Sequence, residues 1–283
     1  MTADVYRSPS GRQAIARDYC EHLRRWTVPL RQRTVATREG PTFVVDCGPS
    51  DAPPVVLLHG AGSNGAVWQA DATRWSVTHR LYMVDLIGEP GLSAPYRPPL
   101  ISNAHALWLN DVLDGLGVRA AAFVGVSLGG WLATDYAIRR PGRVERLALR
   151  APGGIGRQRY GAIVAASVLM QFGSRGTRAG LRCALGPGSI PDPVIDYMLL
   201  IQRNYRPRRD ALPVFSDSQL RAIGAPLFVV LGARDRMLDS HDTAERLARV
   251  QPSASVTLLP GRGHGSFDDG ADLHAFLCRG ART

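Results

Sequence analysis

The chain has 283 residues, of which 45% are hydrophobic and 20% charged, and this ordinary globular composition excludes general disorder. Its 34 basic residues, all of them arginine, outnumber the 24 acidic ones and give a net charge of +10, which would favour an anionic partner. The arginines are nevertheless spread from Arg7 to Arg282 without interleaved aromatic residues, so we expect no nucleic-acid binding.

The first predicted element is an amphipathic helix over Ser10–Trp26, where apolar residues recur at helical spacing. Two strands, at 33–38 and 42–47, are expected on either side of a Glu39-Gly40 turn.

From residue 55 onward, short apolar runs rich in Val and Leu alternate with helical stretches. The runs are Val55–Leu58, Leu81–Asp85, Ala121–Val126, Leu147–Leu149, Leu227–Leu231 and Val256–Leu259. The helical stretches are Trp68–Ser76, Ser102–Gly115, Leu128–Arg139, Asp242–Val250 and Ala271–Arg279. This alternation is typical of an α/β fold in which helices cover both faces of a mostly parallel sheet.

Residues 154–221 interrupt the alternation, because they contain no strand-like run. An apolar helical stretch at Ala162–Phe172 is followed by Gly and Pro residues from Gly173 to Pro193. An insertion of this kind between two core strands is the position of a lid. The predicted organisation is therefore a helix at 1–33 packed on the core, a core at 34–153 and 222–283, and a helical cap at 154–221.

A G-x-S-x-G motif stands at Gly125–Gly129, directly after the strand-like AAAFV and directly before the helical GWLATDYAIRR. The turn is so tight that side chains two residues either side of the serine would clash, so glycines are needed at both places. In this context the motif predicts a nucleophile elbow, with Ser127 as the nucleophile at the amino end of a helix.

A serine hydroxyl needs a positioned base, and seven histidines are available. His264 lies in a glycine-rich loop just past the last predicted strand, at the edge where ligands bind in open α/β sheets. We therefore expect His264 to be the base. Five other histidines are interpreted as structural or solvent-exposed: His22, His79, His105, His241 and His274.

The base must be held in one tautomer by a third group, usually a carboxylate. Asp235 follows the strand-like PLFVVLG, and Asp239 is a rival acid a few residues further on. We favour Asp235 because it lies one loop turn past the strand, from where a carboxylate can reach back to His264. Asp85 is interpreted as a structural residue near the pocket.

Preorganised donors must hold the oxyanion of a tetrahedral intermediate. The backbone N–H of Leu128, directly after the nucleophile, is one candidate. The second is the backbone N–H of Ala61, in the loop that follows the early strand VVLL. His59, in the same loop, is expected to brace it by hydrogen bonding.

The four cysteines are scattered and form no CxxC pair, so we expect reduced thiols, no disulfide framework and no metal site. No stretch approaches the ~18 apolar residues of a membrane span, and no apolar signal segment is visible before Arg33. These features favour a cytoplasmic protein without membrane contact, and they leave its oligomeric state open.

With these pieces assembled, the chain resembles the α/β-hydrolase superfamily from about Thr34 to Ala281. The matching positions are HGAG at His59–Gly62, GVSLGG at Gly125–Gly130, GARD ending at Asp235, and GHGS around His264. The chain order Ser, Asp, His is that of this fold. The segment Asp85–Ser93 is similar to the D-x-x-G-x-G-x-S segment of the superfamily with one extra residue, a variant that resembles a bacterial carboxylesterase-like branch.

The resemblance implies hydrolysis of a small-molecule ester through an acyl-enzyme, without a metal or organic cofactor. A lactonase, a biosynthetic thioesterase or a carbon–carbon bond hydrolase would use the same triad, and the sequence does not separate them. A relative that only binds a ligand or partner is the alternative of another class. Such proteins usually lose a triad member or an oxyanion loop, and none is missing here.

Overall fold

The computed structural model describes residues 5–188, 190–265 and 269–279. Ser266, which belongs to the GHGS motif, and residues 280 and 281, at the end of the expected superfamily match, lie outside the described residues. None of the helices in the described part is long and apolar enough to cross a membrane.

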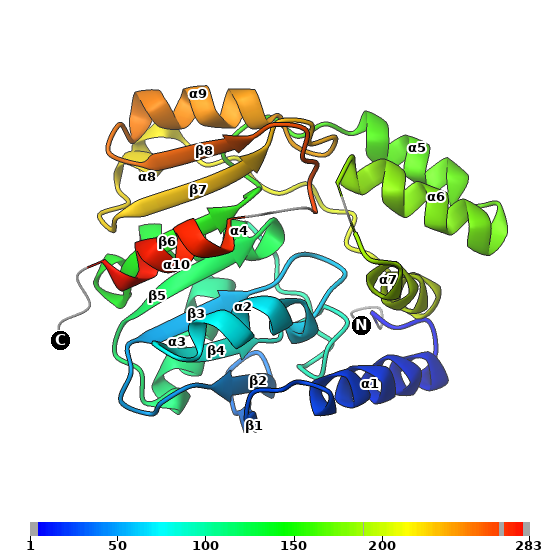
Figure 1. Ribbon diagram of the computed structural model, residues 1–283, viewed down its shortest axis with the longest axis horizontal. Coiled ribbons are helices and arrows are strands. Elements are labelled where there is room, and N and C mark those ends of the chain that lie inside the picture. Colours follow the sequence, from blue (N-terminus) through cyan, green and yellow to red (C-terminus); the bar gives the residue numbers. More distant parts are fainter. Residues whose placement is uncertain (1–4, 189, 266–268, 280–283) are drawn as a thin grey trace.

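The centre of the molecule is an eight-stranded sheet with the strand order β1-β2-β4-β3-β5-β6-β7-β8 (Figure 1). The strands are β1 Arg31–Val35, β2 Thr42–Cys47, β3 Pro54–Leu58, β4 Arg80–Val84, β5 Ala121–Val126, β6 Val144–Arg150, β7 Leu227–Gly232 and β8 Ser255–Leu259. Strand β2 pairs antiparallel with both β1 and β4, and the pairs from β4 through β8 are parallel. Every strand expected from the sequence is present, so the predicted α/β architecture is confirmed.

Helices cover both faces of this sheet, which is what the unbroken apolar runs in the sequence predicted. In β3 the side chains alternate between two buried clusters, with Val56 and Leu58 on one face and Val55 and Leu57 on the other. The first face packs against α3 Ala104–Leu116, α4 Leu128–Arg139, α8 Asp217–Arg221 and α9 Ser240–Val250. The second packs against α1 Pro9–Arg24, the short helix η1 Gly65–Trp68, α2 Gln69–Trp75 and α10 Gly270–Cys278. A further short helix, η2 Pro141–Arg143, leads into β6.

Three helices between β6 and β7 lie together at the right of the sheet in Figure 1: α5 Gly161–Leu169, α6 Gly173–Leu185 and α7 Asp192–Asn204. The helix expected at 162–172 ends at Leu169, and α6 occupies a stretch that the sequence analysis took for Gly and Pro punctuation. Its glycines are tolerated because they lie against α5: a Cβ at Gly176 would overlap the carbonyl oxygen of Leu169, and a Cβ at Gly180 would approach that of Ala166 to 2.8 Å.

Parallel pairing brings the carboxyl ends of β3, β5, β7 and β8 to one edge of the sheet. The loops that leave these ends contain the predicted site residues, so the topology alone gathers them at this edge.

Candidate active site

Ser127 lies at the sharp turn between β5 and α4 and has a left-handed φ of +51°. Non-glycine residues rarely adopt such a φ, and the surrounding structure must enforce it. The enforcement comes from close packing, because a Cβ at Gly125 would lie 2.5 Å from the Gly129 carbonyl oxygen, and one at Gly129 would overlap the Leu58 carbonyl. The G-x-S-x-G motif therefore makes the tight strand–turn–helix expected of it.

The structure brings Ser127, His264 and Asp235 into one hydrogen-bonded line. The distance from His264 Nε2 to Ser127 Oγ is 3.0 Å, and the distance from His264 Nδ1 to Asp235 Oδ2 is 2.7 Å. With Nδ1 donating to the carboxylate, Nε2 is left to accept the hydroxyl proton of Ser127. This arrangement can remove a proton from Ser127 as its oxygen attacks a carbonyl carbon.

Asp235 is buried, and its second oxygen accepts the backbone N–H groups of Met237 at 2.7 Å and Leu238 at 2.9 Å. Burial by itself would raise the pKa of this carboxyl group. The charge and hydrogen bond of His264, together with the two N–H donors, outweigh burial and hold the pKa below its usual value. Asp235 therefore remains an anion that can fix the imidazole.

Asp239, the rival acid, is used elsewhere. It caps α9 by accepting the backbone N–H of Asp242 at 3.1 Å, and it pairs with Arg159 at 2.9 Å. Asp85 is likewise occupied: Oδ1 accepts the Tyr19 hydroxyl at 3.0 Å and the Gly65 N–H at 2.9 Å. Both carboxylates therefore stabilise the local structure around them. This is the role that the sequence analysis gave to Asp85.

His59 braces the loop after β3. Its Nδ1 donates to the Gly60 carbonyl at 2.8 Å, and its Nε2 accepts the Leu86 N–H at 2.9 Å. Burial lowers the pKa of His59 to about 4, so the ring stays neutral and can keep both bonds. The loop lies beside the nucleophile, since a Cβ at Gly60 would be 3.7 Å from Ser127 Cβ.

The proposed oxyanion donors lie on either side of Ser127, Ala61 in this loop and Leu128 at the first turn of α4. Their role as donors stays a prediction. The next residue of the loop, Gly62, is fixed by a group that the sequence analysis did not single out. Its N–H donates to Glu89 Oε2 at 2.7 Å.

Glu89 is fully buried and connects the loop to α7 and the residues after it. The hydroxyl of Tyr205 donates to Glu89 Oε2 at 2.8 Å, and Arg208 Nε lies 3.9 Å from Oε1. A second link between α7 and the loop joins Asn64 Nδ2 to the Tyr197 hydroxyl at 2.5 Å. The only sequence signal for this network was the extra residue in the segment 85–93, because its partners come from distant parts of the chain.

The His264 loop also contacts the helices between β6 and β7. The carbonyl of Leu185, at the end of α6, accepts the backbone N–H of His264 at 2.7 Å. The carbonyl of Pro187 accepts the N–H of Gly263 at 2.6 Å. The carboxyl end of α6 therefore fixes the backbone of the residue that approaches Ser127.

Within the described residues, one group of side chains has metal-ligand character: His79, His274 and Cys278, whose ligand atoms lie within 4.8 Å of one another. It lies at the amino end of β4, away from Ser127, and the Thr78 hydroxyl bridges His79 Nδ1 at 2.9 Å and His274 Nε2 at 2.7 Å. The Thr78 hydroxyl therefore already contacts both imidazoles. Neither Ser127, His264 nor Asp235 belongs to this group.

Comparison with known proteins gives a consistent result. A model of the alpha/beta hydrolase family matches residues 55–276. The chain is 30% identical over 254 residues to an uncharacterized carboxylesterase, nap, of Bacillus subtilis, and the match covers 87% of this chain and 84% of that protein.

Two solved structures from the same organism are similar over nearly their whole length. Carboxylesterase CesB (YbfK) superposes with a TM-score of 0.85 at 27% identity, covering 96% of this chain and 99% of that one. Naproxen esterase (carboxylesterase NP) superposes with a TM-score of 0.81 at 28% identity, covering 96% and 98%.

Proposed function

Because the chain belongs to the alpha/beta hydrolase family, we propose that it is a serine carboxylesterase that hydrolyses a small to medium, largely apolar ester. The observation that carries the proposal is the position of His264, whose two ring nitrogens lie within hydrogen-bond distance of Ser127 and Asp235. Similarity to carboxylesterases supports an ester over the lactone, thioester or carbon–carbon bond substrates that the same triad could cleave.

In the proposed reaction, Ser127 Oγ attacks the ester carbonyl carbon as its proton passes to His264 Nε2. The backbone N–H groups of Ala61 and Leu128 hold the oxyanion that forms. The intermediate collapses when the carbon–oxygen bond to the alcohol breaks, and His264 returns the proton to the leaving alcohol. A water molecule, activated by the same imidazole, then hydrolyses the acyl-enzyme and regenerates Ser127.

The anionic Asp235 stabilises the imidazolium that forms during each half of the reaction. His264 Nε2 can act as the base only while it carries no proton, because it must accept the hydroxyl proton of Ser127. Removal of one oxyanion donor typically lowers kcat by about 100- to 1,000-fold, so the geometry of the 59–62 loop contributes to the rate alongside the triad.

We also propose that residues 154–221 act as a cap over the site and that the protein works in the cytoplasm. Support for the cap comes from the contacts that α6 and α7 make with the loops around Ser127. Support for a reducing compartment comes from the four cysteines, each of which is a free thiol.

The test is hydrolysis of p-nitrophenyl acetate, butyrate and octanoate by the wild type and by Ser127→Ala. We expect turnover by the wild type and its loss in the variant, with the preferred chain length reporting the size of the acyl pocket. A fluorophosphonate probe provides the second measurement, since it labels an activated serine whatever the natural substrate. Failure of the probe to label Ser127 would contradict the proposal and favour a relative that only binds ligands.

A further inference from the structure

The group of three side chains with metal-ligand character lies away from the proposed active site. His79 stands directly before β4, whereas His274 and Cys278 belong to α10. One nitrogen or sulfur atom from each residue lies within 4.8 Å of those from the other two. Residues from two distant parts of the chain therefore meet at one point.

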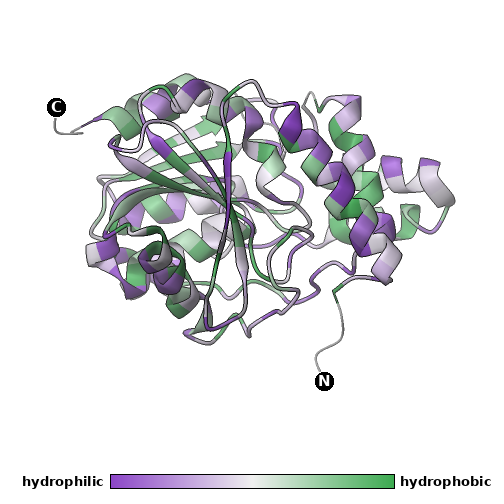
Figure 2. Cartoon of the chain, turned by 90° about the horizontal axis from the view of Figure 1, so that it is seen from below, coloured by the Kyte–Doolittle hydropathy of each residue, from purple (hydrophilic) through white to green (hydrophobic). Residues whose placement is uncertain are grey.

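Helix α10 presents two of these side chains on one side. His274 and Cys278 are four residues apart, and residues at this spacing are neighbours on a helix surface, as in known helical zinc sites. Leu273, Phe276 and Leu277 are buried against the sheet, whereas His274 is half-buried and Cys278 is exposed. Figure 2 shows hydrophobic and hydrophilic segments next to one another on the helices around the sheet, as expected of such amphipathic helices.

The third side chain, His79, is held against this helix. It is buried, and the Trp75 carbonyl at the end of α2 accepts its backbone N–H at 2.9 Å. The Trp75 indole donates to the carbonyl of Gly270, at the start of α10, at 3.3 Å. Trp75 thus contacts both segments, and the ring centroids of His79 and His274 lie 5.7 Å apart.

The hydroxyl of Thr78 lies between the two imidazoles, 2.9 Å from His79 Nδ1 and 2.7 Å from His274 Nε2. A hydroxyl has one proton, so it donates to one ring nitrogen and accepts from the other. Thr78 is exposed, and rotation of its side chain would free both nitrogens for another partner.

We propose that His79, His274 and Cys278 bind a divalent transition-metal ion of the zinc type. Imidazole nitrogen and thiolate sulfur are ligands that Zn²⁺ prefers, whereas Mg²⁺ and Ca²⁺ prefer oxygen. Bonds of about 2.0 Å to nitrogen and about 2.3 Å to sulfur place tetrahedral ligand atoms about 3.3–3.6 Å apart, so the atoms must approach by at most about 1.5 Å. Rotation of the half-buried His274 and the exposed Cys278 supplies this approach. Cys278 binds as the thiolate and releases its proton to water, which also takes the fourth position.

A bound ion connects α10 to the segment between α2 and β4. An unfolded chain does not hold the three ligands together, so the ion stabilises the folded state. The sequence analysis expected no metal site because it considered cysteine pairs, and His79 is distant in the chain from the ligands on α10. This role is independent of the proposed esterase reaction.

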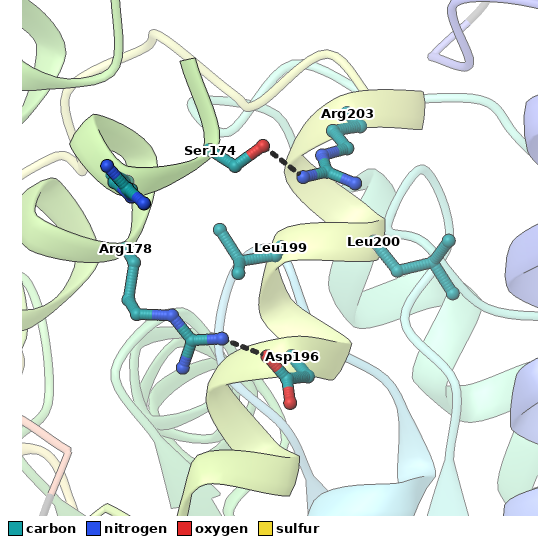
Figure 3. Close-up of a pocket in the computed structure, with 7 residues that line it drawn as sticks. Ser174, Arg178, Asp196, Leu199, Leu200 and Arg203 are labelled. Atoms are coloured by element: carbon teal, nitrogen blue, oxygen red, sulfur yellow. Dashed lines mark hydrogen bonds and ion pairs between the residues drawn. The ribbon is translucent and has the colours of Figure 1, made fainter. Parts of the chain in front are cut away.

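The hollow of about 410 Å³ between α6 and α7 provides a contrast (Figure 3). Its carboxylate, Asp196, already pairs with Arg178, and Arg203 donates to the Ser174 hydroxyl at 2.6 Å. The lining that the structure describes contains neither histidine nor cysteine. A zinc-type ion therefore finds better ligands beside α10 than in this hollow.

The experiment is titration of the reduced full chain with Co²⁺, a spectroscopic substitute for Zn²⁺, followed by competition with Zn²⁺. We expect saturation at one ion per chain, with a sulfur-to-cobalt charge-transfer band in the near ultraviolet that disappears as Zn²⁺ is added. Zn²⁺ should also raise the melting temperature of the protein.

Two variants remove a ligand from the accessible side of the site. Loss of an outer-shell partner of a ligand typically lowers metal affinity about 10- to 100-fold, so we expect His274→Ala to lower it about 100-fold or more. Cys278→Ser should remove the charge-transfer band, and neither variant should be stabilised by Zn²⁺. His79 is left unchanged because it is buried, and its substitution could disturb folding.

Matched controls come from elsewhere in the chain. Cys183→Ser changes a half-buried cysteine of α6, and His241→Ala changes an exposed histidine of α9, so both should bind Co²⁺ as the wild type does. Thr78→Val removes the hydroxyl that competes for both nitrogens, and its binding should be at least as tight as that of the wild type. Fluorophosphonate labelling checks that Ser127 remains reactive in each variant. Since metal binding is measured without ester turnover, its failure and failure of the proposed esterase activity are separate results.

The proposal would be overturned if Co²⁺ gave no saturable charge-transfer band. Equal affinity in the wild type, His274→Ala and Cys278→Ser would mean an adventitious ion only. Loss of binding in Cys183→Ser or His241→Ala would place the ion elsewhere, and weaker binding by Thr78→Val would overturn the assigned ligand set.

Discussion

Glu89 offers the most direct test of how the loop beside Ser127 is held in place. The carboxylate accepts the Gly62 N–H at 2.7 Å and the Tyr205 hydroxyl at 2.8 Å, and it is 1% exposed. Burial raises its pKa, and the Gly62 and Tyr205 hydrogen bonds and nearby arginines oppose that rise. The substitution Glu89→Gln keeps the size of the side chain but removes the negative charge.

We expect this substitution to act on kcat more than on KM. Loss of a complete oxyanion donor lowers kcat by about 100- to 1,000-fold. Glu89 reaches the donor loop through Gly62, one residue after Ala61, so only part of that effect is expected, about 10- to 100-fold. The hydrogen bonds from Gly62 and Tyr205 also lose their charged acceptor, and a hydrogen bond to a charged group contributes about 1.5–3 kcal/mol of stability. Arg208 loses the charge of a buried carboxylate 3.9 Å away.

The assay is steady-state hydrolysis of p-nitrophenyl butyrate together with urea denaturation, for Glu89→Gln and for the control Glu245→Gln. Glu245 is an exposed glutamate of α9, and its substitution is expected to change neither quantity. Tyr205→Phe is an intermediate case, because it removes one hydrogen bond to Glu89 and leaves the contact with Gly62. If Glu89→Gln lowered stability while kcat stayed at the wild-type value, Glu89 would have a purely structural role and this reasoning would be wrong.

Other predictions concern the acid, a buried carboxyl group and the loop of the base. Asp235→Asn should lower kcat by about 10,000-fold. Asp239→Asn should keep a near-full rate and the cap of α9, because asparagine caps a helix about as well as aspartate, and should lose only the ion pair with Arg159, about 0.2–1 kcal/mol. The opposite pattern in a rate assay would reassign the acid. Burial raises the pKa of Asp85 to about 6. The folded state therefore binds this proton more tightly, and the contribution of Asp85 to stability falls by about 3 kcal/mol as pH rises from about 4 to about 6. Asp85→Asn should accordingly destabilise the protein more at pH 4.5 than at pH 7 in urea titrations, and an equal cost at both would contradict the shift. Gly263→Ala places a Cβ against the Leu185 carbonyl, so both kcat and melting temperature should fall, and an unchanged rate would show that the loop tolerates displacement.

The sheet could be predicted because its signal is local. Runs such as Val55–Leu58 and Leu227–Leu231 are apolar on both faces and end at turn residues, and each became a strand. The turn at Ser127 was predictable for a similar reason, since the two glycines that permit it stand in the same five-residue motif. The family match confirms the α/β-hydrolase fold, while the catalytic role of the three side chains stays a prediction.

Helix α6 was not predicted, because its glycines are explained by contacts with another helix and not by the local sequence. Three glycines in thirteen residues lower helix propensity, and Gly176 and Gly180 are favourable only once α5 lies against them. Glu89 is a similar case. Its partners are 27 residues earlier at Gly62 and 116 residues later at Tyr205, and no spacing rule connects these three positions.

Helix α6 and Glu89 each contact a loop of the proposed active site. Glu89 connects the loop of the proposed oxyanion donor to Tyr205, just after α7, and the Leu185 carbonyl connects the loop of His264 to the end of α6. The loop of one proposed oxyanion donor, Ala61, and the loop of the base thus both depend on contacts with the segment between β6 and β7. A displacement of those helices would disturb the base and the oxyanion loop together while leaving Ser127 fixed by the glycines of its own turn. Sequence changes in α6 and α7 should therefore affect kcat as well as substrate choice, although no residue of either helix belongs to the triad.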